Sequence, residues 1–124
     1  KVVRAAAGAC FRVPLREVAE ATDALDELGR LGLTRLGTAA RGGRAVDEVE
    51  LVGPVAVVVG SEARGLRPEL VGCVDQLVTI PMPGRAESLN AAMAATVVTF
   101  EALRQRRAVN RLDAERLAGQ RGRP

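Results

Sequence analysis

The sequence lacks histidine, tryptophan and tyrosine altogether and contains only two phenylalanines. Without histidine, Ser-His catalysis, imidazole acid–base chemistry and most transition-metal sites are excluded. Without tyrosine and tryptophan, the aromatic platforms on which single-stranded nucleic acids stack are missing as well. We therefore expect no metal site, and any chemistry must rest on other polar groups and on the backbone.

Long apolar runs and a cysteine framework are also missing. No apolar segment is long enough to cross a bilayer, and residues 1–15 do not resemble a signal peptide, which indicates a cytoplasmic protein without a membrane partner. Cys10 and Cys73 have apolar neighbours, so we expect small buried side chains in preference to a disulfide or a reactive thiol. Because Lys1 leads directly into a helical pattern, we expect a fragment or a domain of a longer chain.

Charge is distributed unevenly. The formal net charge is +3, but seven arginines lie between Arg104 and Pro124, against only Asp113 and Glu115. A basic tail on a nearly neutral body indicates a polyanion as partner. The alternative is a solvated, disordered tail that only aids solubility.

Alternating helical and strand patterns predict an α/β domain with a mostly parallel sheet. The expected helices cover residues 2–9, 18–31, 68–74 and 88 to about 107, with a helical turn at 47–51. The expected strands cover residues 11–18 (an edge strand), 33–39, 55–59 and 77–80. The β-branched run 55–59 is typical of a central strand covered on both faces. We assign residues 1–108 to this domain and residues 109–124 to a basic extension or tail.

The last expected helix has two faces of different character. One is an apolar stripe made of Leu89, Met93, Val97, Phe100 and Leu103. The other consists of small residues, namely Ala91, Ala95, Val98 and Ala102. The small face would allow close packing against a second subunit, and packing against the protein's own sheet is the alternative.

Three segments are expected to meet at one edge of the sheet, because ligands bind outside the carboxyl ends of parallel strands. Residues 60–66 follow one buried strand, residues 80–84 follow the next, and residues 88–90 open the long helix. Gly60 permits close approach of a ligand to the backbone, and Ser88 is a plausible helix cap. The alternative is a set of ordinary strand-to-helix turns.

Two of these segments resemble motifs of one enzyme family. Residues 58–66 (VVGSEARGL) and 80–95 (IPMPGRAESLNAAMAA) are similar, in order and separation, to the second and third motifs of SpoU-type (TrmH-like) RNA 2'-O-ribose methyltransferases. Residues 1–14 resemble the segment that precedes the third strand in that family, and the similarity extends to about Leu103. The resemblance implies an α/β fold with a C-terminal trefoil knot, truncated here at its N-terminal end, and a homodimer. It also implies S-adenosylmethionine as cofactor and RNA as substrate, with rRNA favoured over tRNA.

The resemblance further implies roles for individual residues. The S-adenosylmethionine site would comprise Thr38, Ala39, Gly60, Ile80, Met82, Ser88 and Leu89. The catalytic positions would be Glu62, Ser88 and Asn90. RNA contacts are expected from Arg64 and Arg85, with Arg4 and Arg41 as further candidates.

The family's first motif, Asn-x-Gly-x-x-x-Arg, is not found in the chain. Its arginine, which helps to activate the ribose hydroxyl, is expected upstream of Lys1. We therefore expect the 124-residue chain to be inactive, or nearly so, by itself. One alternative is a non-catalytic RNA-binding or dimerisation module of the same fold. Another is an unrelated nucleotide-binding α/β domain, but the G-x-G-x-x-G loop that it would carry is absent.

Overall fold

The computed structural model describes residues 2–61, 63–83 and 89–121. In chain order the elements are α1 (Val2–Ala5), the 3-10 helix η1 (Ala9–Phe11), α2 (Ala21–Arg30), β1 (Thr34–Thr38), β2 (Arg44–Ala45), the 3-10 helix η2 (Val46–Glu48), β3 (Val55–Val58), α3 (Pro68–Val71), β4 (Gln76–Thr79) and α4 (Ala91–Arg121). The predicted strands at 33–39, 55–59 and 77–80 and the helix at 18–31 are thus confirmed, with ends shifted by up to three residues.

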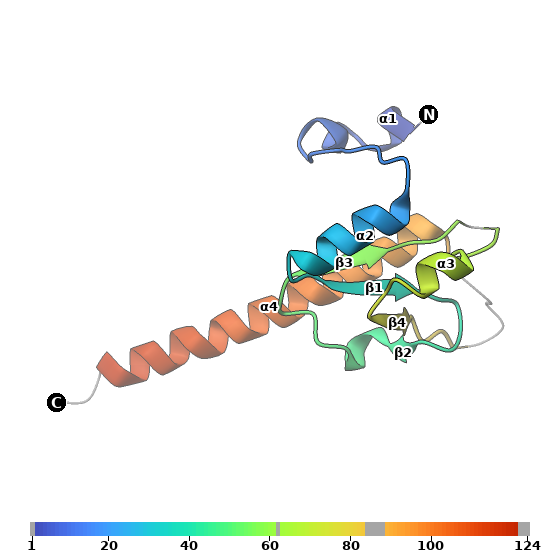
Figure 1. Ribbon diagram of the computed structural model, residues 1–124. Helices are drawn as coiled ribbons and strands as arrows, with labels where there is room; N and C mark the ends of the chain where they lie inside the picture. The colour runs from blue at the N-terminus through green and yellow to red at the C-terminus, as the bar shows by residue number, and fades with distance from the viewer. Residues whose placement is uncertain (1, 62, 84–88, 122–124) are drawn as a thin grey trace.

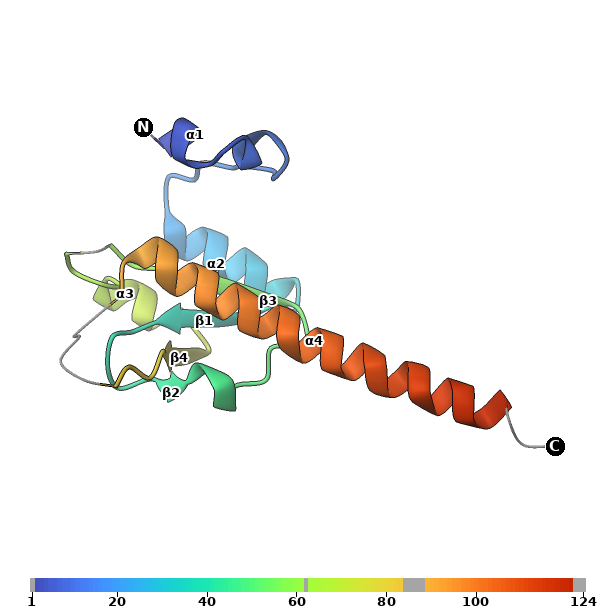
Figure 2. The same cartoon turned by 180° about the vertical axis from the view of Figure 1, so that it is seen from behind.

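The four strands form one sheet in the order β2-β4-β1-β3, and all three pairs are parallel. Helix α4 crosses one face of this sheet, whereas α2 and α3 lie on the opposite face (Figures 1 and 2). The predicted α/β class with a mostly parallel sheet is therefore confirmed. Because the strands are parallel, their carboxyl ends lie along the same edge of the sheet.

The prediction that residues 55–59 form a central strand is wrong for the part of the chain that the structure describes. Strand β3 is an edge strand that pairs with β1. Its four residues are all half-buried, because helices cover both faces of the sheet. A run of β-branched residues indicates a strand whose two faces are both covered. It does not indicate whether the strand pairs with one neighbouring strand or with two.

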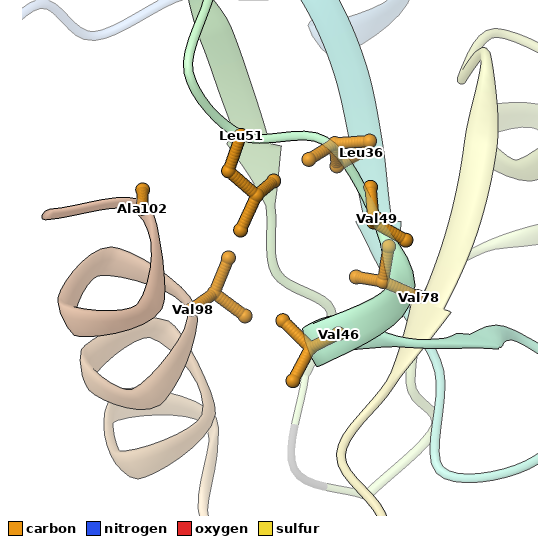
Figure 3. Packing of buried hydrophobic residues seen from close by; sticks show 7 residues of the cluster. All are labelled: Leu36, Val46, Val49, Leu51, Val78, Val98 and Ala102. Carbon is orange, nitrogen blue, oxygen red and sulfur yellow. The ribbon is translucent and has the colours of Figure 1, made fainter. Parts of the chain in front are cut away.

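The core lies between the sheet and α4. Leu36 of β1 and Val78 of β4 pack together with Leu51 and with Val98 and Ala102 of α4 (Figure 3). The small face of the long helix therefore packs on the protein's own sheet, as in the second of the two interpretations. The predicted apolar stripe points elsewhere, since Phe100 is 66% exposed and Met93 and Leu103 are exposed as well.

Helix α4 differs from the prediction at both ends. It begins at Ala91 instead of residue 88, and it continues past Arg107 to Arg121. Its C-terminal half projects beyond the sheet as a straight extension (Figure 2). Residues 109–121 are therefore helical, and the helix runs through position 109 without a break.

The N-terminal segment also departs from expectation. Helix α1 ends at Ala5, and no strand forms over residues 11–18. The alternation of Phe11, Val13 and Leu15 imitates a strand, but all three side chains are exposed and no neighbouring strand pairs with them. The segment α1–η1 stands away from the sheet (Figure 1). Cys10 and Cys73 are free thiols and are half-buried, whereas burial was expected.

Candidate functional site: a cavity at the carboxyl edge of the sheet

A cavity of about 640 Å³ lies where the carboxyl ends of β1, β3 and β4 meet the first turns of α4. Its wall is formed by residues 38–41 after β1, residues 59–61 and 63–66 after β3, Ile80 and Met82 after β4, and Leu89, Ala91, Ala94 and Val98 at the start of α4. This volume falls in the range of small-molecule sites in proteins. The sheet therefore presents one ligand-sized hollow at the edge where parallel α/β folds bind ligands.

The loop after β3 closes on itself at Gly60. The Ser61 N–H donates to the Gly65 carbonyl oxygen at 3.0 Å, and the Gly65 N–H donates back to the Ser61 carbonyl oxygen at 2.8 Å. A Cβ at position 60 would lie 2.0 Å from the carbonyl carbon of Gly65, so no side chain fits there. Gly65 has a φ of 65°, in the left-handed region that favours glycine. Both glycines are needed for this turn, which places bare backbone against the cavity.

The loop after β1 is held between the two neighbouring strands. The Thr38 hydroxyl donates to the Val58 carbonyl oxygen at 3.3 Å, and the Ala39 N–H donates to the Val78 carbonyl oxygen at 2.9 Å. The Thr79 hydroxyl in turn donates to the Ala40 carbonyl oxygen at 3.1 Å. Residues 38–40 therefore form a fixed wall of the cavity.

The start of α4 is capped by Asn90. Its side-chain oxygen accepts a hydrogen bond from the Ala92 N–H at 2.8 Å, and its carbonyl oxygen accepts one from the Ala94 N–H. The prediction placed the cap at Ser88, but asparagine is at least as good a cap and its position sets the first helical residue at Ala91. Asn90 itself does not line the cavity.

Six of the seven residues expected to bind the donor line this one cavity, and they are Thr38, Ala39, Gly60, Ile80, Met82 and Leu89. The seventh, Ser88, lies outside the described residues, as do Glu62 and Arg85. Arg64 lines the cavity and is exposed at its rim, and its N–H donates to the Ser61 hydroxyl at 3.2 Å. Arg41 lines the cavity too, whereas Arg4 belongs to α1, away from the sheet.

The sequence interpretation missed part of the lining. Ala91, Ala94 and Val98 contribute from α4, and their helical spacing was a signal that could have found them. Val71 contributes from α3, on the other side of the cavity from α4, and its place was not evident without the fold. The lining therefore continues from the loops along the first two turns of α4.

The described lining is mostly apolar side chain or backbone, with Thr38 and Ser61 as its hydroxyl side chains and Arg41 and Arg64 as its charged ones. Such a wall suits an uncharged ring that is read through backbone N–H and C=O groups, with positive charge where a polyanion would approach. Over residues 2–61, 63–83 and 89–121, no three Cys, Asp or Glu side chains gather as a metal site would require. Nor is any helix in these ranges long and apolar enough to span a membrane.

The pronounced pKa shifts occur outside the cavity. Arg35, near the amino end of β1, forms an ion pair with Asp75 through Nη2 and Oδ1 at 2.7 Å, and its backbone N–H donates to Asp75 Oδ2 at 2.7 Å. These hydrogen bonds lower the pKa of Asp75 to about 2. The pair ties β1 to the start of β4, at the end of the strands opposite the cavity.

A ligand-sized cavity at the carboxyl ends of parallel strands is the arrangement found in α/β domains that bind small molecules. Comparison with known sequences then identifies the family. Residues 1–100 match the model of the SpoU rRNA Methylase family. The chain belongs to this family. A protein of Mycolicibacterium vanbaalenii, named an uncharacterized tRNA/rRNA methyltransferase, is 44% identical over 104 residues, which are 84% of this chain and 33% of that protein. The chain thus spans about a third of the length of this curated relative.

Solved structures with a similar fold include enzymes that are named as SpoU or RNA methyltransferases. The A. aeolicus TrmH/SpoU tRNA modifying enzyme has a TM-score of 0.80 at 30% identity, covering 87% of this chain and 55% of that one. The SpoU methyltransferase AviRb of Streptomyces viridochromogenes, solved with the cofactor AdoMet, has a TM-score of 0.76 at 34% identity, covering 86% and 44%. An RNA 2'-O ribose methyltransferase has a TM-score of 0.72 at 36% identity, covering 85% and 40%.

Proposed function

We propose that this chain is the donor-binding part of an S-adenosylmethionine-dependent RNA 2'-O-ribose methyltransferase that acts on rRNA in the cytoplasm. The observation that carries the proposal is the cavity at the carboxyl edge, whose size and apolar lining suit an adenosyl group. Membership of the SpoU rRNA Methylase family and the likeness to an RNA 2'-O ribose methyltransferase support the reaction.

The donor would be held chiefly by backbone. Gly60, Ile80 and Leu89 would contact S-adenosylmethionine, and Thr38, Ala39, Met82 and Ser88 would complete the site. The cavity lining and the AdoMet complex of the similar AviRb enzyme support this assignment. Bound S-adenosylmethionine supplies a methyl group on a sulfonium. The fixed wall at residues 38–40 and the closed Gly60 turn would orient the donor, and orientation alone provides a large part of such a rate enhancement.

Catalytic roles are proposed for Glu62, Ser88 and Asn90, which occupy the matching motif positions. Asn90 would act by fixing the start of α4, which its cap hydrogen bond supports. Arg64 at the cavity rim, with Arg85, would contact RNA phosphate. Residues 1–124 contain no Asn-x-Gly-x-x-x-Arg segment. We therefore expect the 124-residue chain to bind the donor but hardly to methylate, because the motif's arginine, which would help to activate the ribose hydroxyl, is not among these residues.

The SpoU-like motifs also imply a trefoil knot and a homodimer, and both belong to the proposal. The exposed Met93, Phe100 and Leu103 on the outer face of α4 support a subunit contact, because contiguous exposed apolar side chains mark interaction surfaces. Light scattering of the full-length protein should give the mass of a dimer, and Phe100→Arg should shift it towards the monomer.

Calorimetry with S-adenosylmethionine on the full-length protein tests the proposed function. One site per protomer is expected. Leu89→Arg should abolish binding without unfolding the protein, because Leu89 lines the cavity but is 37% exposed. Leu117→Arg, the same change at an exposed position of α4, is the matched control. Unchanged binding by Leu89→Arg, or no binding by the wild type, would refute the proposal.

A second candidate is a non-catalytic RNA-binding or dimerisation module of the same fold. It is favoured by one observation, namely that the described lining contains no carboxylate or lysine. The two candidates differ in one assay on the full-length protein. An enzyme transfers labelled methyl groups from S-adenosylmethionine to deproteinised ribosomal RNA, whereas the module binds the RNA and transfers none.

A further inference from the structure

Helix α4 connects the cavity with a surface far from it. Ala91, Ala94 and Val98 in its first turns line the cavity, and the same helix continues to Arg121 beyond the sheet (Figure 2). At about 1.5 Å per residue, Arg107 lies roughly 20 Å and Arg111 roughly 26 Å along the axis from Ala94. Because α4 is one continuous helix, the turns that line the cavity and the projecting half are held at a fixed separation.

Two of the arginines at the base of this projection have structural partners. Arg104 forms an ion pair with Glu101 at 2.7 Å. Arg106 donates to the carbonyl oxygens of Leu51 at 3.2 Å and Gly53 at 2.8 Å. The Arg104 pair lies within α4, whereas the Arg106 hydrogen bonds fix α4 to the loop that leads into β3, so the projection starts from an anchored base.

Arg107 and Arg111 are different. Both side chains are exposed, and in the described part of the chain neither guanidinium takes part in an ion pair or a hydrogen bond. Their spacing of four residues places them on one face of the helix, with Cβ atoms about 6 Å apart. Arginine forms bidentate hydrogen bonds with phosphate, and the basic residues of this part of the sequence are all arginine. The part of the face that Arg107 and Arg111 occupy, before Glu115 one turn further on, is thus complementary to a polyanion in charge and in hydrogen-bond geometry.

We propose that Arg107 and Arg111 contact phosphates of the substrate RNA at a point roughly 20–26 Å from the methyl-donor cavity. The inference rests on the proposed function and extends it. Helix α4 would hold flanking RNA at a fixed distance from the nucleotide that enters the cavity. The protein should therefore prefer RNAs long enough to reach both places over short oligonucleotides that reach only the cavity. An ordered helix presents its charges at fixed positions, which a disordered basic tail does not.

The test is filter binding of deproteinised ribosomal RNA to the full-length protein with Arg107→Gln/Arg111→Gln. The matched control is Arg30→Gln/Arg116→Gln, which removes the same charge from α2 and from another face of α4. We expect the first variant to bind this RNA at least about tenfold more weakly. Its slope of log K against log salt should fall by roughly 1.4–1.8, since each lost phosphate contact contributes about 0.7–0.9. The control should resemble the wild type, and a tetranucleotide should bind all three proteins equally.

Each other outcome overturns the inference. Equal losses in both variants would mean that only net charge matters. Wild-type affinity in the Arg107/Arg111 variant would mean that the face does not contact RNA. If affinity is unchanged but light scattering shows loss of the dimer, the face is a protein interface. Calorimetry with S-adenosylmethionine separates these outcomes from failure of the proposed function, because donor binding by the wild type and by both variants is expected to be identical.

Discussion

The side-chain amide of Gln105 forms hydrogen bonds with two backbone groups around Leu51. The Leu51 N–H donates to Gln105 Oε1 at 2.8 Å, while Gln105 Nε2 donates to the Val49 carbonyl oxygen at 2.9 Å. One residue of α4 thereby substitutes for a neighbouring strand along the segment between η2 and β3. Since Leu51 is fully buried, its backbone needs such a partner.

Gln105→Ala should lower the free energy of unfolding by about 1–3 kcal/mol, because it leaves a donor and an acceptor without partners in a half-buried place. Gln105→Glu keeps the acceptor but loses the donor, and it adds a second carboxylate beside Glu101, so it should be destabilised as well. Urea denaturation measures both. Asn110→Ala on the exposed part of α4 is the control and should change stability by less than about 0.5 kcal/mol. Equal stability of Gln105→Ala and the control would contradict this account of the contact.

Gly60→Ala should disrupt the loop after β3, because its Cβ would clash with the backbone of Gly65. We expect the affinity for S-adenosylmethionine to fall by at least about tenfold, which corresponds to about 1.4 kcal/mol. Gly53→Ala is the matched control, since a Cβ there meets nothing within 4 Å. Calorimetry on both variants, with circular dichroism to verify folding, makes the comparison. Tight binding by Gly60→Ala would show that the closed turn is not needed.

Leu36→Ala should lower the free energy of unfolding more than Leu117→Ala does. Leu36 is fully buried between β1 and α4, and its removal leaves a cavity that costs about 2–5 kcal/mol. Leu117→Ala removes the same atoms from an exposed position and should cost no more than about 0.5 kcal/mol. Thermal unfolding ranks the two, and similar melting temperatures would contradict the assigned core.

Stability should fall in acid, partly through the Arg35–Asp75 pair. The pKa of Asp75 is about 2 in the folded protein against 3.8 ordinarily, so folding favours its charged form. This contribution is complete above about pH 4 and is lost as the pH falls through about 2. The pKa of Glu101 is lowered to about 2 as well, mainly by hydrogen bonds from Arg104 and Gln105. Its contribution disappears over the same range.

Asp75→Asn should therefore flatten the dependence of stability on pH between about 4 and 2, and Asp75→Asn/Glu101→Gln should flatten it further. The effect of each pair is modest because both carboxylates remain partly solvated. Asp113→Asn, which removes an exposed acid outside the described ion pairs, should leave the slope as in the wild type. Denaturation at several pH values below 5 measures the slopes, and identical slopes in all four proteins would contradict the assignment.

The sequence predicted the parts of the fold that depend on short-range pattern. The run Val55–Val58 formed a strand because its side chains suit a sheet with two covered faces. Its position at the edge was not predictable in this way, because lateral pairing depends on strand order and not on side-chain type. The segment from Phe11 to Leu15 alternates like a strand, but no strand pairs with it: Phe11 ends the 3-10 helix η1 and the residues that follow are irregular.

The candidate site was predictable to the extent that it follows strand ends. Gly60, Ile80 and Leu89 come from three segments that parallel strands bring to one edge, and the structure does bring them to one cavity. The orientation of α4 was not predictable from apolar spacing. The helix has two apolar faces, and the smaller one, with Val98 and Ala102, is buried because alanine and valine permit close packing on the sheet. The side chains of Phe100 and Met93, on the other apolar face, are exposed.

The central claim is that one cavity at the carboxyl edge of the sheet binds the methyl donor. A crystal structure of the full-length protein with S-adenosylmethionine tests it most directly. The account predicts the adenosyl group between the Gly60 turn, Ile80 and Leu89, with its polar edge on backbone N–H and C=O groups. A donor bound at any other place on the protein, with this cavity filled only by water, would contradict it.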